Sequence, residues 1–245
     1  MSGRLDGRIA LVTGASEGIG RATALALARE GAAVVVTARN ADALKQLVGE
    51  IESQGGKGLA VPGDARLDED VARVRDATLA LYDEVDILVN NVGIAKYAPF
   101  SEMTIEDYDW MMDTNMRSTF LFTKAFFPGM AERRQGWVVI VASVSGLMGL
   151  PNETGYAPSK HAQVGFARAL DHEAIKVGVK VSLIVPGSVN TRHAFGTGRT
   201  PQDAKLPEYM DPQDVAEAVV FAVTQPEKSR LFMLGMRPMN ETLFD

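Results

Sequence analysis

Cysteine is absent from this chain of 245 residues. A disulfide framework and thiolate chemistry are therefore excluded. Long apolar runs are lacking as well, since no stretch approaches the roughly 20 residues that a membrane-spanning helix needs. The opening residues, MSGRLDGRIALV, carry too much charge and too short an apolar run for a signal peptide. We therefore expect a cytoplasmic protein with no membrane partner.

Charge of one sign is not concentrated anywhere along the sequence. The net charge is −6 and no block of like charges occurs, so we expect no nucleic-acid partner. The three histidines, His161, His172 and His193, lack both the spacing of metal ligands and the partners of a nucleophilic triad. We therefore expect no metal site, and we take all three histidines to be structural or exposed.

The chemically most informative stretch is Tyr156-Ala157-Pro158-Ser159-Lys160. Residues four apart lie on one face of a helix, and Pro158 places the pair in the first helical turn. A phenol has a pKa near ~10, and an adjacent ammonium lowers that pKa by stabilising the phenolate. The pair can thus move a proton on and off a substrate oxygen. Taken alone, the same spacing also fits the start of an ordinary amphipathic helix.

Short apolar segments alternate with helical segments along most of the chain. This alternation predicts a single α/β domain over residues 1–245, with a doubly wound parallel sheet of about seven strands and helices on both faces. The expected strands are 8–13, 33–38, 58–61, 86 into the turn at 90–93, 137–142, 179–185 and 231–234. The expected helices are 19–30, 42–53, 68–82, 104–134 with an interruption at Pro128-Gly129, 154–177 and 212–224. Residues 192–210 are polar and aperiodic, which is typical of a lid.

A glycine-rich turn, Gly14-Ala15-Ser16-Glu17-Gly18-Ile19-Gly20, joins the first strand to the first helix. Glycines let the backbone approach a pyrophosphate and the helix N-terminus offers free N–H groups, so the turn is a phosphate site or else a plain tight turn. Arg39 suits a 2′-phosphate and so favours NADP(H), unless it is only a solvated strand end. Asp64 either reaches an adenine edge or caps the helix that starts near Leu67. These residues and Asn90 fall at strand carboxyl ends, where ligands bind in such sheets.

Together, these motifs resemble those of the short-chain dehydrogenase/reductase family in its compact form. The resemblance extends over essentially the whole chain and is carried by T13-G-x-x-x-G18-x-G20, N90-N-x-G93, Asn115, Ser143, Y156-x-x-x-K160 and P186-G187. It implies a Rossmann-type fold, a nicotinamide dinucleotide and a homotetramer or homodimer. It also implies that Tyr156 is the acid/base on the substrate oxygen and that Ser143 hydrogen-bonds that oxygen. Lys160 would bind the nicotinamide ribose and lower the pKa of Tyr156, while Asn115 would help to hold a water on the proton relay.

The expected cofactor-binding residues follow from the turn and the resemblance. They are Gly14, Ser16, Glu17, Gly18, Ile19, Gly20, Arg39, Asp64, Ala65, Asn91, Val92, Gly93, Tyr156, Lys160, Pro186, Gly187, Val189 and Thr191. Val92 stands where the family commonly has alanine. The C-terminal sequence LFMLGMRPMNETLFD lacks the glycine pair of many members, which argues against an acyl-carrier-protein reductase and for small hydroxy acids, aldehydes or other polar carbonyls.

We expect an NADP(H)-dependent oxidoreductase, with NAD(H) also possible, that interconverts a small carbonyl and an alcohol by hydride transfer. The alternatives are a 3-oxoacyl thioester reductase and a non-catalytic dinucleotide-binding regulator; the chain has no room for the extra domain of a related epimerase or dehydratase. Four side chains of the lid fit either an anionic substrate or a solvated loop: Arg192, His193, Arg199 and Lys205. Apolar residues on the Asn115 helix and on the helix after Tyr156 exceed what one sheet face needs, which predicts a homotetramer.

Overall fold

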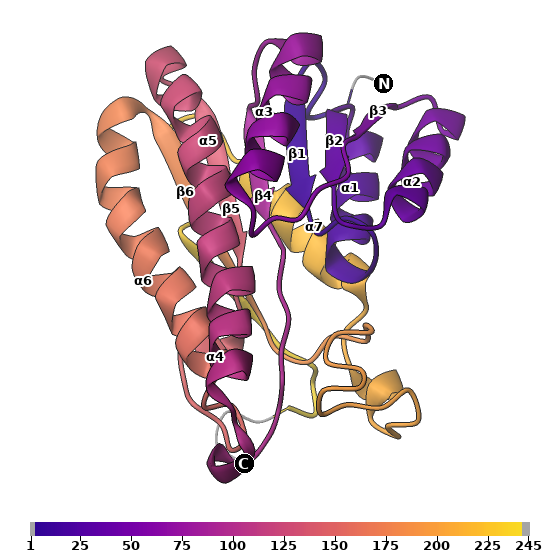
Figure 1. Cartoon of the computed structure of the whole chain (residues 1–245). Coiled ribbons are helices and arrows are strands. Elements are labelled where there is room, and N and C mark those ends of the chain that lie inside the picture. Colours follow the sequence, from indigo (N-terminus) through magenta and orange to yellow (C-terminus); the bar gives the residue numbers. More distant parts are fainter. Residues whose placement is uncertain (1–2, 242–245) are drawn as a thin grey trace.

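The computed structural model describes residues 3–241 and contains one sheet of seven parallel strands (Figure 1). The strands are β1 (Ile9–Thr13), β2 (Ala33–Thr37), β3 (Lys57–Ala60), β4 (Ile87–Asn90), β5 (Gly136–Val141), β6 (Val179–Pro186) and β7 (Met233–Met236). Their order in the sheet is β3-β2-β1-β4-β5-β6-β7. The expected Rossmann-type sheet is therefore confirmed, and its topological switch point, where a ligand crevice opens, lies between β1 and β4.

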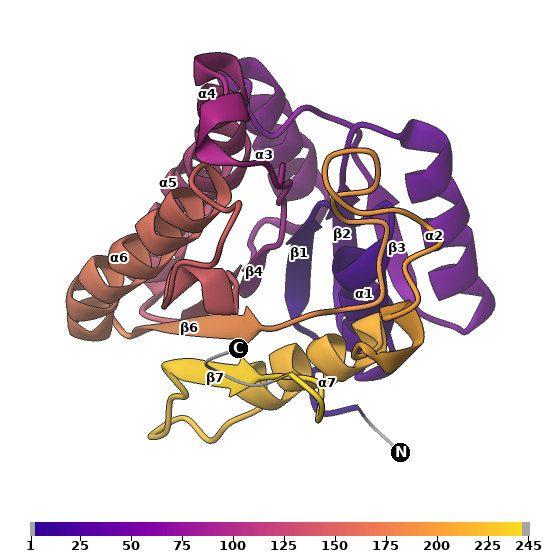
Figure 2. The same ribbon diagram turned by 90° about the horizontal axis from the view of Figure 1, so that it is seen from below.

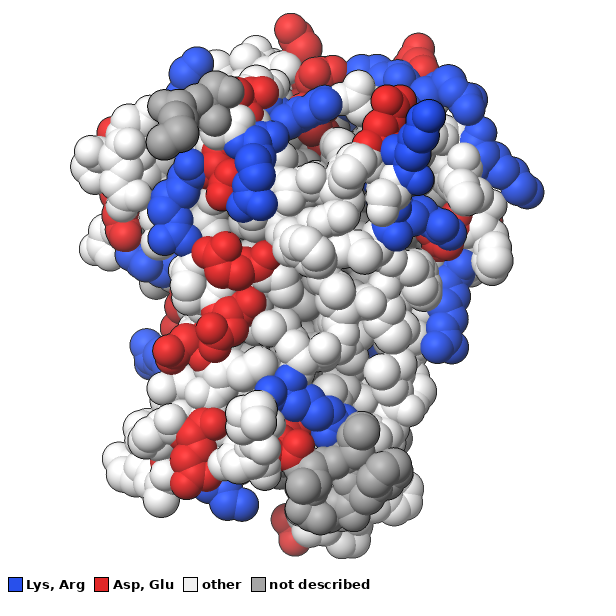
Figure 3. Space-filling model, turned by 180° about the vertical axis from the view of Figure 1, so that it is seen from behind, with Lys and Arg blue, Asp and Glu red and all other residues white. Residues whose placement is uncertain are grey.

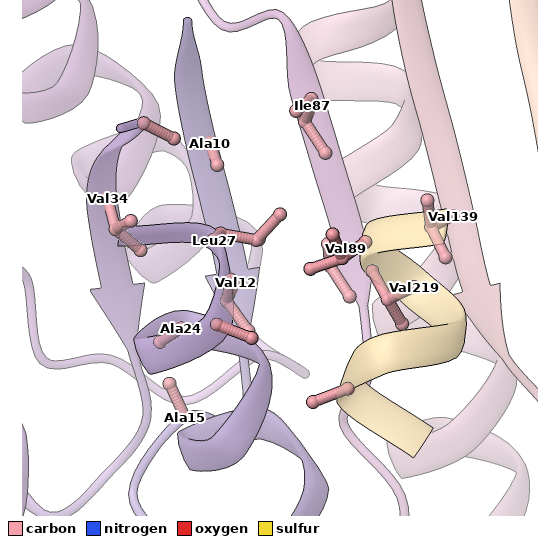
Figure 4. Packing of buried hydrophobic residues seen from close by; sticks show 14 of the residues in the cluster. Ala10, Val12, Ala15, Ala24, Leu27, Val34, Ile87, Val89, Val139 and Val219 are labelled. Atoms are coloured by element: carbon pink, nitrogen blue, oxygen red, sulfur yellow. The ribbon is translucent and has the colours of Figure 1, made fainter. Parts of the chain in front are cut away.

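Helices cover both faces of the sheet (Figures 1 and 2). They are α1 (Gly18–Arg29), α2 (Ala41–Ser53), α3 (Asp68–Tyr82), α4 (Ile105–Met111), α5 (Ser118–Arg133), α6 (Tyr156–Ala174) and α7 (Pro212–Val223). Buried side chains of α1, α2 and α7 form one core, and those of α3, α5 and α6 form the other. Strand β1 serves both cores because successive side chains point to opposite faces. Val12 packs with Leu27 and Val219 in the first core (Figure 4), whereas Leu11 belongs to the second.

The expected helix over 104–134 differs from the observed one in two respects. It is not interrupted at Pro128, because α5 runs through that residue and ends only at Arg134, which has a left-handed backbone (φ 54°). Proline removes one helical hydrogen bond, but Phe126 and Met130 anchor the helix in the core on either side of it. The irregularity lies earlier instead, at Met112–Arg117, where the helix widens into a π-helical turn. The seventh strand is also shifted, to Met233–Met236, so that the expected span 231–234 begins too early.

The segment 192–210 lies beyond the carboxyl ends of the strands, in orange in Figure 1. It contains one short 3₁₀ helix, Leu206–Glu208, and docks on the loop after β4. The Tyr97 N–H donates to the Thr197 carbonyl at 2.8 Å, and the Thr197 hydroxyl donates to the Ala95 carbonyl at 2.6 Å. These contacts hold the segment over the crevice at the switch point.

Two further features concern the surface. Basic and acidic side chains are interspersed on the face shown in Figure 3. Among residues 3–241, none of the helices combines the length and apolarity required to cross a bilayer.

Candidate active site

A cleft of about 1610 Å³ runs along the carboxyl ends of the strands. All but one of the expected cofactor residues line it, and Ser143 does so as well. The exception is Gly20, which packs beneath the glycine-rich turn. A Cβ at this position would lie 2.3 Å from the Gly14 carbonyl oxygen and 2.4 Å from the Asn91 amide nitrogen, so only glycine fits.

The glycine-rich turn presents the start of α1 to the cleft. Gly14 has a φ of 64°, in the left-handed region that favours glycine. The Asn91 amide donates to the carbonyls of Thr13 and Gly14, at 3.0 and 3.2 Å, and so ties the turn to the end of β4. Among the described residues, no side chain caps α1 and its first turn carries no acidic residue. Its N–H groups are thus available to an anion such as a pyrophosphate.

Arg39 lies at the far end of the cleft, just after β2. Its side chain is exposed, and within residues 3–241 it makes no side-chain hydrogen bond or ion pair. Asp64 is nearby and is paired with Arg66, whose guanidinium donates to both carboxylate oxygens at 2.7–3.2 Å and lowers the pKa of Asp64. The alternative that Asp64 caps the following helix is wrong, because the residue at the N-cap of α3 is Leu67 and the Asp64 carboxylate bonds Arg66 instead.

Tyr156 occupies the other end of the cleft, at the first residue of α6, and is only 5% exposed. The Lys160 ammonium nitrogen lies 5.9 Å from the centroid of the Tyr156 ring, as expected for neighbours on one helical face. Burial raises the pKa of Tyr156, while a hydrogen bond with the Ser143 side chain opposes that rise. In the protein without cofactor, burial thus makes the net shift of the Tyr156 pKa upward, and the lowering of that pKa by Lys160 stays a prediction.

Lys160 is itself buried, with 3% exposure, and burial lowers its pKa to about 7. Its ammonium donates to the Val141 carbonyl oxygen at 3.2 Å and to the Gln163 amide oxygen at 2.9 Å. A Cβ on Gly93 would lie 3.3 Å from the same nitrogen, so the loop after β4 closes tightly over it.

Asn115 lies behind the cleft and does not line it. Its amide exchanges two hydrogen bonds with the backbone of Ile94, at 2.8 and 2.9 Å, and donates to the Ser159 hydroxyl at 2.8 Å. The side chain therefore joins the loop after β4 to α6. Its backbone carbonyl, in the π-helical turn, accepts from the Gln163 amide at 2.9 Å and from the Thr119 hydroxyl at 2.8 Å.

Two rings pack against Tyr156 in contacts that the sequence does not predict. The Tyr97 ring meets the Tyr156 ring edge-on at 5.7 Å, and the His193 ring lies at the same distance on another side. Burial and the charges of Lys160 and Arg199 lower the pKa of His193 to about 3, so the imidazole is neutral at pH 7. Of the three histidines, His193 thus departs from the structural or exposed reading, because it contacts the candidate acid/base.

Glu153 is a further residue that the sequence does not single out. Its side chain is 8% exposed, and one carboxylate oxygen finds no hydrogen-bond partner within the described part of the chain. Burial raises its pKa, and a hydrogen bond with Ser145 partly opposes that rise. The carboxyl group lies in the wall of the cleft near Tyr156.

Comparisons with known proteins agree with this geometry. The family model for short chain dehydrogenase matches residues 8–201. A 3-oxoacyl-[acyl-carrier-protein] reductase of Synechocystis is 36% identical, with 91% of each chain covered. An uncharacterized oxidoreductase of Staphylococcus aureus is 34% identical over 96% of this chain and 99% of that one.

Solved structures agree as well. An alcohol dehydrogenase of Thermococcus sibiricus complexed with 5-hydroxy-NADP has a TM-score of 0.88 at 27% identity, covering 96% of this chain and 98% of that one. A 7α-hydroxysteroid dehydrogenase complexed with NADH and 7-oxo glycochenodeoxycholic acid has a TM-score of 0.88 at 30% identity, with 96% and 95% covered. A metagenomic short-chain oxidoreductase in complex with NADP has a TM-score of 0.84 at 29% identity, with 97% and 100% covered. The chain therefore belongs to the short-chain dehydrogenase/reductase family of NAD(P)-dependent oxidoreductases.

Proposed function

We propose that the protein is an NADP(H)-dependent oxidoreductase that interconverts a small carbonyl compound and its alcohol. One observation carries the proposal: a single cleft has an exposed arginine and a glycine-rich turn at one end and a buried tyrosine flanked by serine and lysine at the other. The first end suits a phosphorylated dinucleotide, and the second suits proton transfer to a substrate oxygen.

The residues present fit a nicotinamide dinucleotide. The uncapped start of α1 would hold the pyrophosphate, and Gly20 is closely packed so that this turn keeps its shape. Arg39 would meet a 2′-phosphate with a charge-assisted hydrogen bond, which favours NADP(H) over NAD(H). The NADP complexes among the similar structures support the same choice. When bound, the cofactor supplies or accepts the hydride.

The protein's own contribution is proton transfer and alignment. Because burial raises its pKa, Tyr156 keeps its proton at neutral pH and can donate it to a carbonyl oxygen during reduction. The Ser143 side chain, which hydrogen-bonds Tyr156, is placed to bond the same substrate oxygen. In the oxidative direction Tyr156 must first lose its proton, and the Lys160 ammonium is the group that supports the phenolate.

The segment 192–210 acts in this proposal as a substrate lid. It brings His193 against Tyr156 and is fixed to the loop that carries Tyr97. Aromatic rings on both sides of the phenol exclude water from the reacting oxygen, which strengthens every polar contact made there. Small carbonyl compounds with an apolar flank suit such walls.

A 3-oxoacyl thioester reductase is the second candidate, because that activity is named for the Synechocystis relative. A regulator without catalysis is the third; the burial of Tyr156 beside Ser143 and Lys160 argues against it. A screen of aldehydes, ketones, hydroxy acids and one 3-oxoacyl thioester, followed by NADPH oxidation or NADP⁺ reduction, separates the three. Turnover of small carbonyls supports the main proposal, whereas turnover of the thioester alone supports the second. Binding of NADPH without turnover of any compound in either direction would support the third candidate, a regulator without catalysis.

We also propose a cytoplasmic homotetramer assembled on α5 and α6. Phe120 of α5 is 46% exposed, and its ring meets the Phe166 ring of α6 at 6.0 Å, so the two helices share an apolar outer surface. Sedimentation at micromolar concentration should give four times the mass of one chain. A monomer would contradict this assembly, and a Phe120→Lys variant that dissociates would locate it.

A further inference from the structure

Gln163 forms a bridge behind the active site. It lies on α6 three residues after Lys160 and is fully buried. Its amide oxygen accepts from the Lys160 ammonium at 2.9 Å. Its amide nitrogen donates to the Asn115 carbonyl at 2.9 Å and to the Thr119 hydroxyl at 2.8 Å. One side chain therefore connects Lys160 with the π-helical turn.

We propose that Gln163 is a positioning residue, which holds Lys160 beside Tyr156 and closes the path between Lys160 and the Asn115 carbonyl. The family resemblance expects Asn115 to help hold a water on the proton relay at this place. Here the Asn115 carbonyl already accepts from Gln163 and Thr119. A carbonyl oxygen has two lone pairs, and these two donors occupy them.

The side-chain amide of Gln163 cannot relay a proton between Lys160 and Asn115. A water can accept a proton on one side and release one on the other, whereas a glutamine amide does not ionise and only fixes geometry. After the product has left, the proton that Tyr156 gives to the substrate oxygen during reduction is therefore replaced from solvent water that enters the cleft, and not through Asn115. This inference rests on the proposed acid/base role of Tyr156.

The surroundings of Lys160 make Gln163 its principal side-chain partner. The titratable groups that face the ammonium are Tyr156, whose ring centroid lies 5.9 Å away, and His193, whose pKa the lysine charge lowers. No carboxylate of residues 3–241 forms an ion pair with it. The remaining acceptor is the backbone carbonyl of Val141, which no substitution removes. Replacing Gln163 therefore changes the one side-chain acceptor of the ammonium.

The test measures the pKa of Lys160 directly, in the protein without cofactor or substrate. Lysine labelled with ¹³C at Cε is titrated by NMR, and the Lys160 signal is assigned by its loss in Lys160→Met. Gln163→Met removes the acceptor and should lower the pKa of Lys160 by about one unit, because a hydrogen bond to a charged group is lost. Gln163→Glu places a carboxylate there and should raise the same pKa. Thr119→Val is the matched control, since it removes only the other contact of the amide and should move the pKa by no more than a few tenths.

The two Gln163 variants should shift the pKa of Lys160 in opposite directions, which general damage to the fold would not do. In steady-state assays, Gln163→Met should lower kcat at least tenfold while the substrate KM changes less than threefold, because Lys160 acts on Tyr156 and does not touch the substrate. Unchanged Lys160 titration in both variants, or an equal shift in Thr119→Val, would overturn the inference. A wild-type protein that turns over no carbonyl would refute the proposed function instead, and leave the titration result standing.

Discussion

Cofactor choice at Arg39 offers the most quantitative prediction. NADPH differs from NADH by one phosphate on the adenosine ribose, which carries close to two negative charges. Ala38 and Arg39 follow β2, so no carboxylate stands at the strand end to bind the bare hydroxyl or repel the phosphate. The double change Ala38→Asp with Arg39→Leu adds repulsion and removes attraction, and should reverse the preference.

The magnitude follows from the kind of contact. A hydrogen bond to a charged group contributes about 1.5–3 kcal/mol, and about 1.4 kcal/mol corresponds to one decade in binding. The single change Arg39→Leu should therefore lower kcat/KM for NADPH roughly 10- to 100-fold and leave the value for NADH nearly unchanged. Because the Arg39 side chain is exposed, salt should weaken its contribution, and the effect should shrink at high ionic strength. The carboxylate of Glu17, in the glycine-rich turn, repels a phosphate and so opposes the preference for NADPH. The guanidinium of Arg192 lies 3.9 Å from that carboxylate and counters its charge.

The assay is the ratio of kcat/KM for the two cofactors in the wild type and each variant. Arg75→Leu is the control, because Arg75 is a partly exposed arginine that pairs with Asp76 on α3 and does not line the cleft. A wild type that favours NADH would refute the reasoning. A ratio of kcat/KM that does not change in Arg39→Leu would also refute it, and would show that this arginine is only a solvated strand end.

Three further outcomes are expected. Lys160→Ala should weaken both cofactor binding, read by fluorescence titration, and turnover; loss of only one would contradict its double role. Gly20→Ala should lower the free energy of unfolding by about 1–3 kcal/mol and weaken dinucleotide binding, because its Cβ would lie 2.3 Å from the Gly14 carbonyl oxygen. Burial lowers the pKa of Lys160 from 10.5 in the unfolded chain to about 7 in the folded protein. Between these pH values the unfolded chain therefore binds one more proton than the folded protein, and the contribution of Lys160 to the free energy of unfolding rises with pH. The stability of Lys160→Met relative to wild type should therefore be greater at pH 6 than at pH 10, and a pH-independent difference in melting would refute the shift.

The sheet could be predicted from the sequence because its strands have strong local signals. Apolar segments such as 8–13 and 33–38 are buried on both faces, and the alternation with helices leaves few other arrangements. The glycine-rich turn and the Tyr156–Lys160 pair could be predicted as well, because each depends only on the spacing of residues close together in the sequence. The first forms one end of the cleft and the second forms the other.

The rest depends on contacts between distant segments. His193 contacts Tyr156 only because residues 192–210 fold back over the cleft, and no local pattern specifies that return. The π-helical turn at Met112–Arg117 allows the Asn115 carbonyl to reach Gln163, 48 residues later. The burial of Tyr156 is also a property of the fold: the helical spacing predicts its charged neighbour Lys160, but not the burial that raises the pKa of the phenol.

The central claim is that Tyr156 is the acid/base of an oxidoreductase, and one substitution tests it most directly. Tyr156→Phe removes the phenol hydroxyl and keeps the ring that packs against Tyr97 and His193. The account predicts that NADPH binding, measured by titration without substrate, stays within about threefold of wild type. Turnover of the best carbonyl substrate should fall by at least ~10²–10⁴-fold, as is typical when a general acid is lost. Near wild-type turnover in Tyr156→Phe would contradict the account.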